Sequence, residues 1–319
     1  MSAAAGLVAD IGGTNARLTW VAPGRPGLQD EAWVPVAEHA TLVQAVQHYL
    51  ESLQQRQGPG YRPPRSACLA VATAVTGDEI AFTNSGWRFS QRALKQALGL
   101  ESLVVLNDFE ALALALPHLG ASHLRLHGPA LRRDAPLAVV GPGTGLGVAC
   151  TLPVAGGWVA LPGEGGHATL APHDAFEDAV LAQARRHHAH VSAERLLSGI
   201  GLPLLHEAVA AADGRPIRAM STPEIIREGL AGDTGCRRTL DTFCAMLGGF
   251  AGNVALTTGA RGGVLIGGGL VPRLGSLFFE SAFRERFVAK GRLQSYLQAI
   301  PTGVITDPSA ALVGAATRL

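Results

Sequence analysis

Two distant stretches of the chain repeat one pattern, and this repeat most constrains the fold. "VADIGGTNARLTW" begins at Val8 and "VVGPGTGLGVACTL" begins at Val139. Each is an apolar strand, a turn rich in Gly and Thr, and a second apolar strand. Each also opens a further alternation of strand and helix signals. We therefore predict a duplicated α/β architecture with a cleft between its halves.

The signals that follow each hairpin set the expected elements. In the first half, apolar runs and helical spacing predict strands at 6–10, 16–22, 31–37, 67–75, 79–84 and 102–108, with helices at 41–56, 90–98 and 109–116. In the second half, they predict a strand–turn–strand at 137–152, strands at 262–268 and 302–307, and helices at 175–188, 193–197, 202–211, 223–230, 237–256 and 309–319.

Composition supports a compact, water-soluble protein. Of 319 residues, 47% are hydrophobic and 16% are charged, which is typical of a globular chain. The net charge of +1 gives no field that would attract nucleic acid or an acidic membrane, so we expect neither partner. The uncharged run 135–163 contains too many glycines and prolines to be a membrane helix. The N-terminus lacks the basic start of a signal peptide, and we expect a cytoplasmic protein.

The cysteines give no sign of a disulfide or zinc site. They form no Cys-x-x-Cys pair and have no histidine at zinc-finger spacing. Free thiols in a reducing compartment are therefore expected at all four positions, Cys68, Cys150, Cys236 and Cys244.

The glycines of the two hairpin turns favour phosphate binding. At such a turn, successive backbone N–H groups can point into one concavity that holds phosphate oxygens. One turn alone would favour a plain β-hairpin. Two matched turns and a third cluster, Gly267–Gly269, favour a nucleotide instead. Asp10, near the end of the first strand, could hold Mg²⁺ through water, and Thr14, Asn15 and Thr144 could add polar contacts.

Other phosphate-binding motifs are excluded. A P-loop needs Gly-Lys-Ser or Gly-Lys-Thr, which the sequence does not contain. A dinucleotide fingerprint needs glycines that open a helix, whereas these turn a hairpin. The only lysines are Lys95 and Lys290, so backbone amides, hydroxyls and a metal ion would have to bind the phosphates.

Asn107 and Asp108 lie where a buried strand ends and a helix begins, in "VVLNDFEALALALP". Asn and Asp are preferred helix N-caps, and from the sequence alone the cap is the favoured interpretation. The carboxyl end of a strand is also where α/β proteins bind ligands, so one residue can cap the helix while the other contacts a substrate.

Glu164 and His167 lie among glycines in "LPGEGGHATL". Their spacing is that of a Glu-x-x-His metal pair, but that motif requires a helix, and Gly165 and Gly166 disfavour one. Glu194, in "HVSAERLLSG", lies near the start of a short helix. Its spacing fits a surface charge that interacts with the helix dipole.

These stretches together resemble one family, the bacterial ATP-dependent glucokinases of the hexokinase/actin-like superfamily. The matching blocks, in order from about residue 6 to 319, are "LVADIGGTNARL", "FTNSGWRFS", "LNDFEALALALP", "GPGTGLGVA", "LPGEGGHATLAP", "HVSAERLLSG" and "GGVLIGGGLVPR". The zinc-containing repressor/kinase branch is not indicated, because the cysteines form no zinc motif. The resemblance implies a two-domain, ribonuclease H-like α/β fold with an interdomain active-site cleft. A small domain would comprise residues 1–117 and 302–319, and a large domain residues 118–301.

The resemblance also implies the site. Asp108 would be the general base for the 6-hydroxyl of D-glucose, and the other sugar contacts would be Asn107, Gly145, Glu164, His167 and Glu194. ATP would lie against two phosphate loops and a glycine cluster on the adenosine side. The first loop would be formed by Asp10, Gly12, Gly13, Thr14 and Asn15, and the second by Gly143, Thr144, Gly145 and Gly147. The adenosine-side cluster would be Gly267, Gly268 and Gly269. Asp10 would serve Mg²⁺. Members of the family are typically homodimers.

Three alternatives remain open at this point. The chain could phosphorylate another hexose, such as mannose or glucosamine, which differ from glucose at single groups. It could be a sugar- and ATP-binding regulator without turnover, although an intact Asp108 argues against this. It could be a structural actin-like ATPase, in which the sugar contacts would have no purpose. Pro142 departs from the family pattern and has no N–H to give to a phosphate.

Overall fold

The computed structural model describes residues 4–23, 27–82 and 86–319, which form two compact units. Unit 1 contains residues 1–119 and 308–319, and unit 2 contains residues 120–307. The sequence placed the second boundary at 302, but strand β13 (Thr302–Ile305) pairs within the sheet of unit 2. Thr83 and Asn84, the end of the strand expected at 79–84, lie outside the described residues.

Unit 1 is built on a five-stranded sheet with the order β3-β2-β1-β4-β7. The two hairpin connections are antiparallel, whereas β1, β4 and β7 run parallel. The strands are β1 (Gly6–Ile11), β2 (Asn15–Val21), β3 (Gln29–Pro35), β4 (Ser66–Val71) and β7 (Ser102–Asn107), with a separate pair, β5 (Glu79–Ala81) and β6 (Arg88–Ser90).

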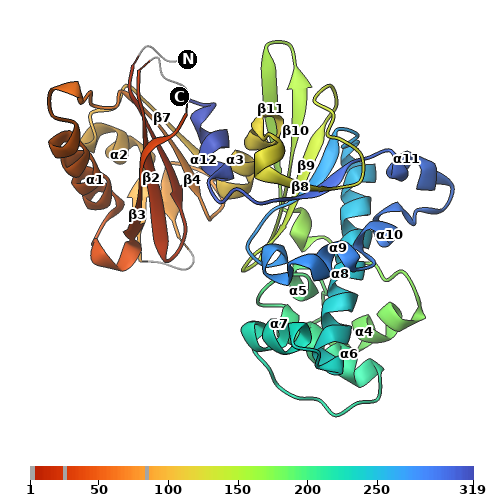
Figure 1. Ribbon diagram of the computed structural model, residues 1–319. Helices are drawn as coiled ribbons and strands as arrows, with labels where there is room; N and C mark the ends of the chain where they lie inside the picture. The colour runs from red at the N-terminus through yellow and green to blue at the C-terminus, as the bar shows by residue number, and fades with distance from the viewer. Residues whose placement is uncertain (1–3, 24–26, 83–85) are drawn as a thin grey trace. The chain divides into compact units, whose positions relative to one another are not determined.

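Helices cover both faces of this sheet. α1 (Leu42–Gln57) and α2 (Gln91–Ala97) lie over one face, and α3 (Asp108–Ala115) and α12 (Ala310–Ala316) lie over the other (Figure 1). Leu7, Ala9 and Ile11 of β1 join the core cluster beneath α1, and the intervening Val8 is equally buried. Burial on both faces explains why β1 reads as a continuous apolar run. Short 3₁₀ turns complete the unit at Val36–Glu38, Gly58–Gly60 and Leu116–His118.

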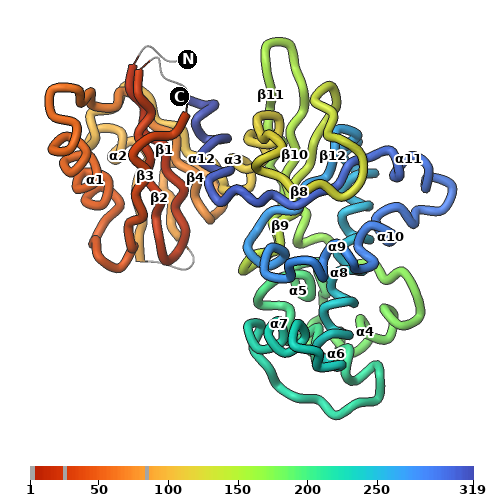
Figure 2. Tube along the Cα trace, in the orientation of Figure 1, coloured from red at the N-terminus to blue at the C-terminus, as the bar shows by residue number. Residues whose placement is uncertain are grey.

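The C-terminal helix α12 packs against α3, although the two are far apart in the sequence (Figure 2). Gly314 makes this approach possible, because a Cβ at this position would overlap the carbonyl oxygen of Ala111. The packing of α12 therefore fixes the position of α3, the helix that begins with Asp108.

Unit 2 is built on a six-stranded sheet with the order β11-β10-β9-β12-β13-β8. β9, β10 and β11 are antiparallel neighbours, and β9, β12 and β13 run parallel. Besides β13, the strands are β8 (Leu124–His127), β9 (Leu137–Pro142), β10 (Leu146–Val154), β11 (Gly157–Gly163) and β12 (Gly263–Ile266). The sequence did not predict β8 or β11.

Five strands of unit 2 repeat the whole sheet of unit 1. In each, a meander of three antiparallel strands continues into two parallel strands, and the second sheet adds only β8. The predicted α/β class and the predicted duplication are therefore confirmed.

The helices of unit 2 surround α8 (Thr234–Thr258), which contacts α6, α7 and α10. α8 begins three residues before the expected helix because Asp233 caps it, with Oδ1 accepting the N–H of Cys236 at 2.8 Å. The other helices are α4 (Ala175–Arg185), α5 (Ala193–Leu196), α6 (Leu202–Ala212), α7 (Thr222–Leu230), α9 (Ser276–Glu280), α10 (Phe283–Val288) and α11 (Gln294–Gln298), with 3₁₀ turns at Ala121–His123, Gly165–His167, Val271–Leu274 and Gly291–Leu293.

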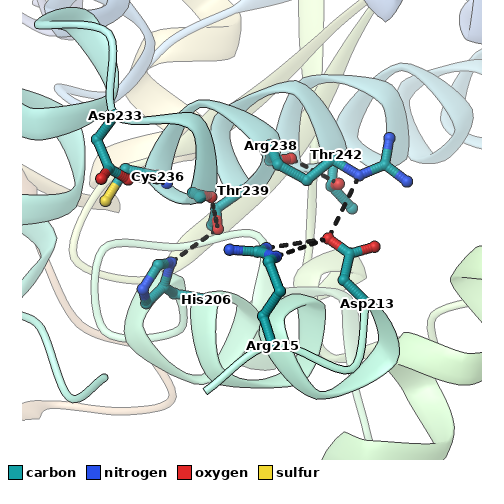
Figure 3. Close-up of polar contacts among 9 residues, drawn as sticks. His206, Asp213, Arg215, Asp233, Cys236, Arg238, Thr239 and Thr242 are labelled. Carbon is teal, nitrogen blue, oxygen red and sulfur yellow. Dashed lines mark hydrogen bonds and ion pairs between the residues drawn. The ribbon is translucent and has the colours of Figure 1, made fainter. Parts of the chain in front are cut away.

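A polar network joins α6 to α8 (Figure 3). Nδ1 of the buried His206 lies 2.8 Å from Thr239 Oγ1, which in turn donates to the Gly235 carbonyl at 3.1 Å. Nearby, Arg215 and Arg238 both approach the carboxylate of Asp213, at 2.9 and 3.8 Å. Burial lowers the pKa of His206. This histidine is thus a buried, hydrogen-bonded part of the helix packing.

Among the described residues, no helix is both long and apolar enough to cross a membrane. The four cysteines are buried and free. Burial raises the pKa of each thiol, to about 12 for Cys68 and Cys244 and about 11 for Cys236.

Candidate active site

The parallel strands of unit 1 bring three predicted site residues to one edge of its sheet. Asp10 is the next-to-last residue of β1, Asn107 is the last residue of β7, and Asp108 is the first residue of α3. β4 lies between β1 and β7, and all three strands run in the same direction. Their carboxyl ends therefore meet where α/β proteins bind ligands.

Asn107 caps α3, as its residue type predicts. Its Oδ1 accepts the N–H of Phe109 at 2.9 Å, and its Nδ2 donates to the Thr73 carbonyl at 3.3 Å. Oδ1 of Asp108 lies 2.9 Å from the same Phe109 N–H. The cap and the neighbouring strand connection thus hold both side chains in place.

The two carboxylates of this edge are electrostatically coupled. Burial, and then the negative charge of Asp10, raise the pKa of Asp108 to about 6. Burial also raises the pKa of Asp10, which the charge of Arg17 opposes. Arg17 itself is committed elsewhere, because it lies 3.5 Å from Glu31 and donates to the Pro308 carbonyl. When both carboxylates are ionised, the edge therefore carries more negative charge than the single Arg17 balances.

A divalent cation fits this imbalance. Carboxylate oxygens are the ligands that Mg²⁺ prefers, and Mg²⁺ commonly keeps several waters while it binds one or two carboxylates and the phosphates of a substrate. In the described part of the chain, no group of three or more His, Cys, Asp or Glu side chains could hold a metal. Asp10 is thus suited to bind Mg²⁺ together with water and phosphate, and not as part of an all-protein cage.

The first glycine turn, residues 12–14, leaves backbone donors open. The N–H of Gly12 closes the turn by donating to the Asn15 carbonyl at 3.0 Å, so it is not available to a ligand. Among the described residues, the amides of Gly13 and Thr14 have no acceptor. Asn15 already belongs to β2. The turn can therefore offer two adjacent N–H groups to an anion.

The second turn, residues 143–145, has the same property. The N–H of Gly143 closes it by donating to the Gly145 carbonyl at 2.9 Å. Within the described chain, the amides of Thr144 and Gly145 have no acceptor. Gly147, which the sequence assigned to this loop, lies in β10 opposite Gly141 and outside the turn.

The third glycine cluster lies beside the second turn, because β9 and β12 are parallel neighbours. The Gly267 N–H donates to Val140, and Gly268 has a φ of 74° with no room for a Cβ, which would lie 2.5 Å from the Pro142 carbonyl oxygen. Pro142 is buried at the end of β9, and its carbonyl accepts the Leu270 N–H at 3.1 Å. It is a strand residue, so its missing N–H is not a gap in the turn.

Glu164, His167 and Glu194 come together in unit 2. His167 Nε2 lies 4.0 Å from Glu164 Oε2 and 3.8 Å from Glu194 Oε1. Glu164 and His167 are well exposed, at 74% and 60% of their side chains, whereas only 23% of the Glu194 side chain is exposed. Glu194 also accepts the Leu146 N–H at 2.8 Å. The interpretation of Glu194 as a surface charge is therefore wrong.

This cluster can bind several hydroxyl groups at once. Carboxylates accept hydrogen bonds, and an imidazole can both donate and accept, which matches the mixed donors and acceptors of a sugar. The segment Gly165–His167 forms a 3₁₀ turn and not an α-helix. The disfavoured helical metal pair is accordingly absent from this segment.

Sequence reasoning missed two backbone groups of the site. The Thr73 carbonyl holds the amide of Asn107, and the Leu146 N–H holds Glu194. Backbone partners far along the chain leave no residue-type signal. The single hint was that Leu146 directly follows a turn glycine.

Comparisons with known proteins agree on one family. A family profile described as Glucokinase matches residues 7–319. The chain is 47% identical over 316 residues to a glucokinase from Chromobacterium violaceum, covering 98% of this chain and 88% of that protein. It is 44% identical to the Bifunctional protein glk of Burkholderia pseudomallei, covering 98% of this chain and 48% of the relative, so it spans about half of that relative's length. The crystal structure of a glucokinase from an Antarctic psychrotroph is similar with a TM-score of 0.91 and 36% identity, covering 99% of this chain and 98% of that one.

Proposed function

Because the chain belongs to the glucokinase family, we propose that it transfers the γ-phosphoryl group of ATP to the 6-hydroxyl of D-glucose, giving glucose 6-phosphate and ADP. The main observation behind this proposal is the raised pKa of Asp108, about 6, at the carboxyl edge of the unit 1 sheet. A base with that pKa is ionised at neutral pH and still accepts a proton efficiently.

In the proposed reaction, the sugar O6 forms a bond to the γ-phosphorus. The bond between this phosphorus and the bridging oxygen of the β-phosphate breaks, and the hydroxyl proton passes to the carboxylate of Asp108. Asn107 holds the start of α3 so that Asp108 stays in place. Most of the remaining acceleration in phosphoryl transfer comes from positioning and from neutralising phosphate charge.

We assign nucleotide binding to the open amides of the two glycine turns. Gly13 and Thr14 belong to the first turn, and Thr144 and Gly145 to the second. Gly267–Gly269 lie beside the second turn, where the adenosine would bind. Mg²⁺, held through Asp10, would supply the positive charge that the phosphates require.

We assign sugar binding to Glu164, His167 and Glu194, with Asn107 as a further contact. Their mixed donors and acceptors suit a hexose, and glucose is the substrate named for the relatives. Mannose and glucosamine differ from glucose at one group. One contact contributes only a few kcal/mol of discrimination unless a buried partner is left unpaired.

We also propose a cytoplasmic homodimer. The expectation of a dimer follows from the family, and light scattering of the purified protein would give its mass in solution directly.

The decisive experiment is a coupled kinase assay of the purified protein against a panel of hexoses. ATP, ADP and polyphosphate should be compared as phosphoryl donors, with and without Mg²⁺. We expect glucose- and Mg²⁺-dependent consumption of ATP. Nucleotide consumption that does not depend on any sugar would contradict the proposal and would favour an ATPase.

A further inference from the structure

The second glycine turn and the sugar-side carboxylate meet at one peptide group, that between Gly145 and Leu146. The N–H of this peptide donates to Glu194 Oε2 at 2.8 Å. The other oxygen of the carboxylate, Oε1, lies 3.8 Å from His167 Nε2. Glu194 therefore has one oxygen anchored by the turn and one directed to its neighbour in the cluster.

Gly145 leaves the space that this arrangement needs. A Cβ at position 145 would overlap Glu194 Oε2 and would lie 3.3 Å from Glu194 Cδ. Backbone conformation does not require this glycine, because Gly145 is not among the residues with a positive φ. The constraint is therefore steric, and it comes from a side chain that is distant in the sequence.

Neighbouring contacts show that the turn also supports the rest of the cluster. A Cβ at Gly166, between Glu164 and His167, would overlap the carbonyl oxygen of Leu146. Beyond Glu194, the Gly199 N–H donates to the Gly143 carbonyl at 2.7 Å. The two segments that carry the cluster thus pack against the turn and against the first residue of β10, which follows it.

We propose that Gly145 is a positioning residue for the sugar, acting through Glu194. This proposal rests on the proposed function, since it concerns the same sugar site. A side chain at position 145 displaces the carboxylate from the Leu146 N–H and from His167. The backbone N–H of residue 145, assigned to phosphate binding, remains present in an alanine variant.

The first test is Gly145→Ala, assayed for both substrates. We expect the KM for glucose to rise about tenfold, the effect of losing one charged hydrogen bond, while the KM for ATP changes less than about twofold. Gly249→Ala is the matched control, because a Cβ there would point into open space beside α8 and Gly249 is outside the site. This control should leave both constants unchanged.

A double-mutant cycle separates action through Glu194 from a general defect. In a Glu194→Ala background, Gly145→Ala should add less than about a twofold change in the glucose KM, because the group that it displaces is gone. If the two effects multiply, or if Gly145→Ala raises the KM for ATP instead, the proposal is overturned.

Two further measurements keep the outcome decisive. If Gly145→Ala is too unstable to assay, Glu194→Asp should rescue it, because the shorter carboxylate leaves room for the added methyl. The double variant should then be as stable as Glu194→Asp alone, and the absence of this rescue overturns the proposal. Calorimetry of glucose binding to the wild-type protein tests the proposed function separately. A wild type that neither binds nor phosphorylates glucose refutes that function, whereas an active wild type with independent effects refutes only the role of Gly145.

Discussion

The carboxylate of Asp10 raises the pKa of Asp108, and burial raises the pKa of both. The two residues are far apart in the sequence, but β1 and β7 are among the parallel strands of one sheet and end at the same edge of it. Binding of a proton or a cation at this edge therefore reduces the repulsion between the two carboxylates. The proposed general-base role of Asp108 and the proposed Mg²⁺ site at Asp10 both depend on this property.

The pH dependence of kcat/KM should report Asp108. A general base must be ionised, so activity is present above a pH of about 6 and is lost as the pH falls through this value. We expect an acid limb of unit slope near pH 6 in kcat/KM for glucose at saturating ATP and Mg²⁺. A profile that stays flat down to pH 5 would be inconsistent with this assignment.

Asp108→Ala should abolish detectable phosphoryl transfer while glucose binding remains measurable. Asn107 keeps capping α3 in this variant, so the start of the helix should persist. The assay is product formation over hours, with glucose affinity measured by calorimetry. Substantial turnover by the variant would remove Asp108 as the base.

Asp108→Asn should stabilise the protein at neutral pH as it inactivates it. The pKa of Asp108 is raised to about 6 in the fold, against about 4 in an unfolded chain. The contribution of Asp108 to the free energy of unfolding is fully present below pH 4. It is lost as the pH rises through 6, and the total loss is up to about 3 kcal/mol. The amide keeps an oxygen for the Phe109 N–H, so Tm without ligands should rise at pH 8. The gain should vanish at pH 4.

Glu164→Gln should weaken glucose binding more than ATP binding. With 74% of its side chain exposed, Glu164 contributes little to stability, so Tm should stay within about one degree of the wild type. The KM for glucose should rise several-fold, as expected when a charged hydrogen-bond acceptor becomes neutral. Equal losses for both substrates would count against a sugar contact.

Gly314→Ala should destabilise unit 1 through the packing of α12 on α3. The added methyl overlaps the Ala111 carbonyl oxygen, and such overpacking costs about 1–3 kcal/mol. We expect Tm to fall by several degrees, whereas Gly249→Ala, where the described structure has room for the methyl, should not lower it. A Gly314→Ala variant as stable as the wild type would show that the helices can separate without cost.

The sequence predicted the parts of the site that depend on local signals. The two hairpins and the Asn107 cap are encoded by residue types at short spacing, and the structure contains both. Local spacing alone made Glu194 fit a surface charge, because its anchor, the Leu146 N–H, is distant along the chain. β11 was missed because apolar and polar residue types do not alternate along it, and most of its side chains are exposed. Long-range packing, which local patterns do not record, decided these features.

The assignment of single glycines shows the same limit. The sequence assigned Gly145 to a phosphate loop and to the sugar contacts, but the close approach of the Glu194 carboxylate to it is visible only in the structure. By contrast, Gly147 looked equivalent by motif and lies in β10. Glycines of one motif thus have different structural roles.

The burial of all four thiols has a practical consequence for spectroscopy. Because each is shielded and has a raised pKa, the native protein should react slowly with maleimides at neutral pH. A cysteine introduced at an exposed position in each unit could then carry a dye pair without prior removal of native thiols. Energy transfer between the dyes, recorded as glucose is titrated, would report how the two units respond to the sugar in solution.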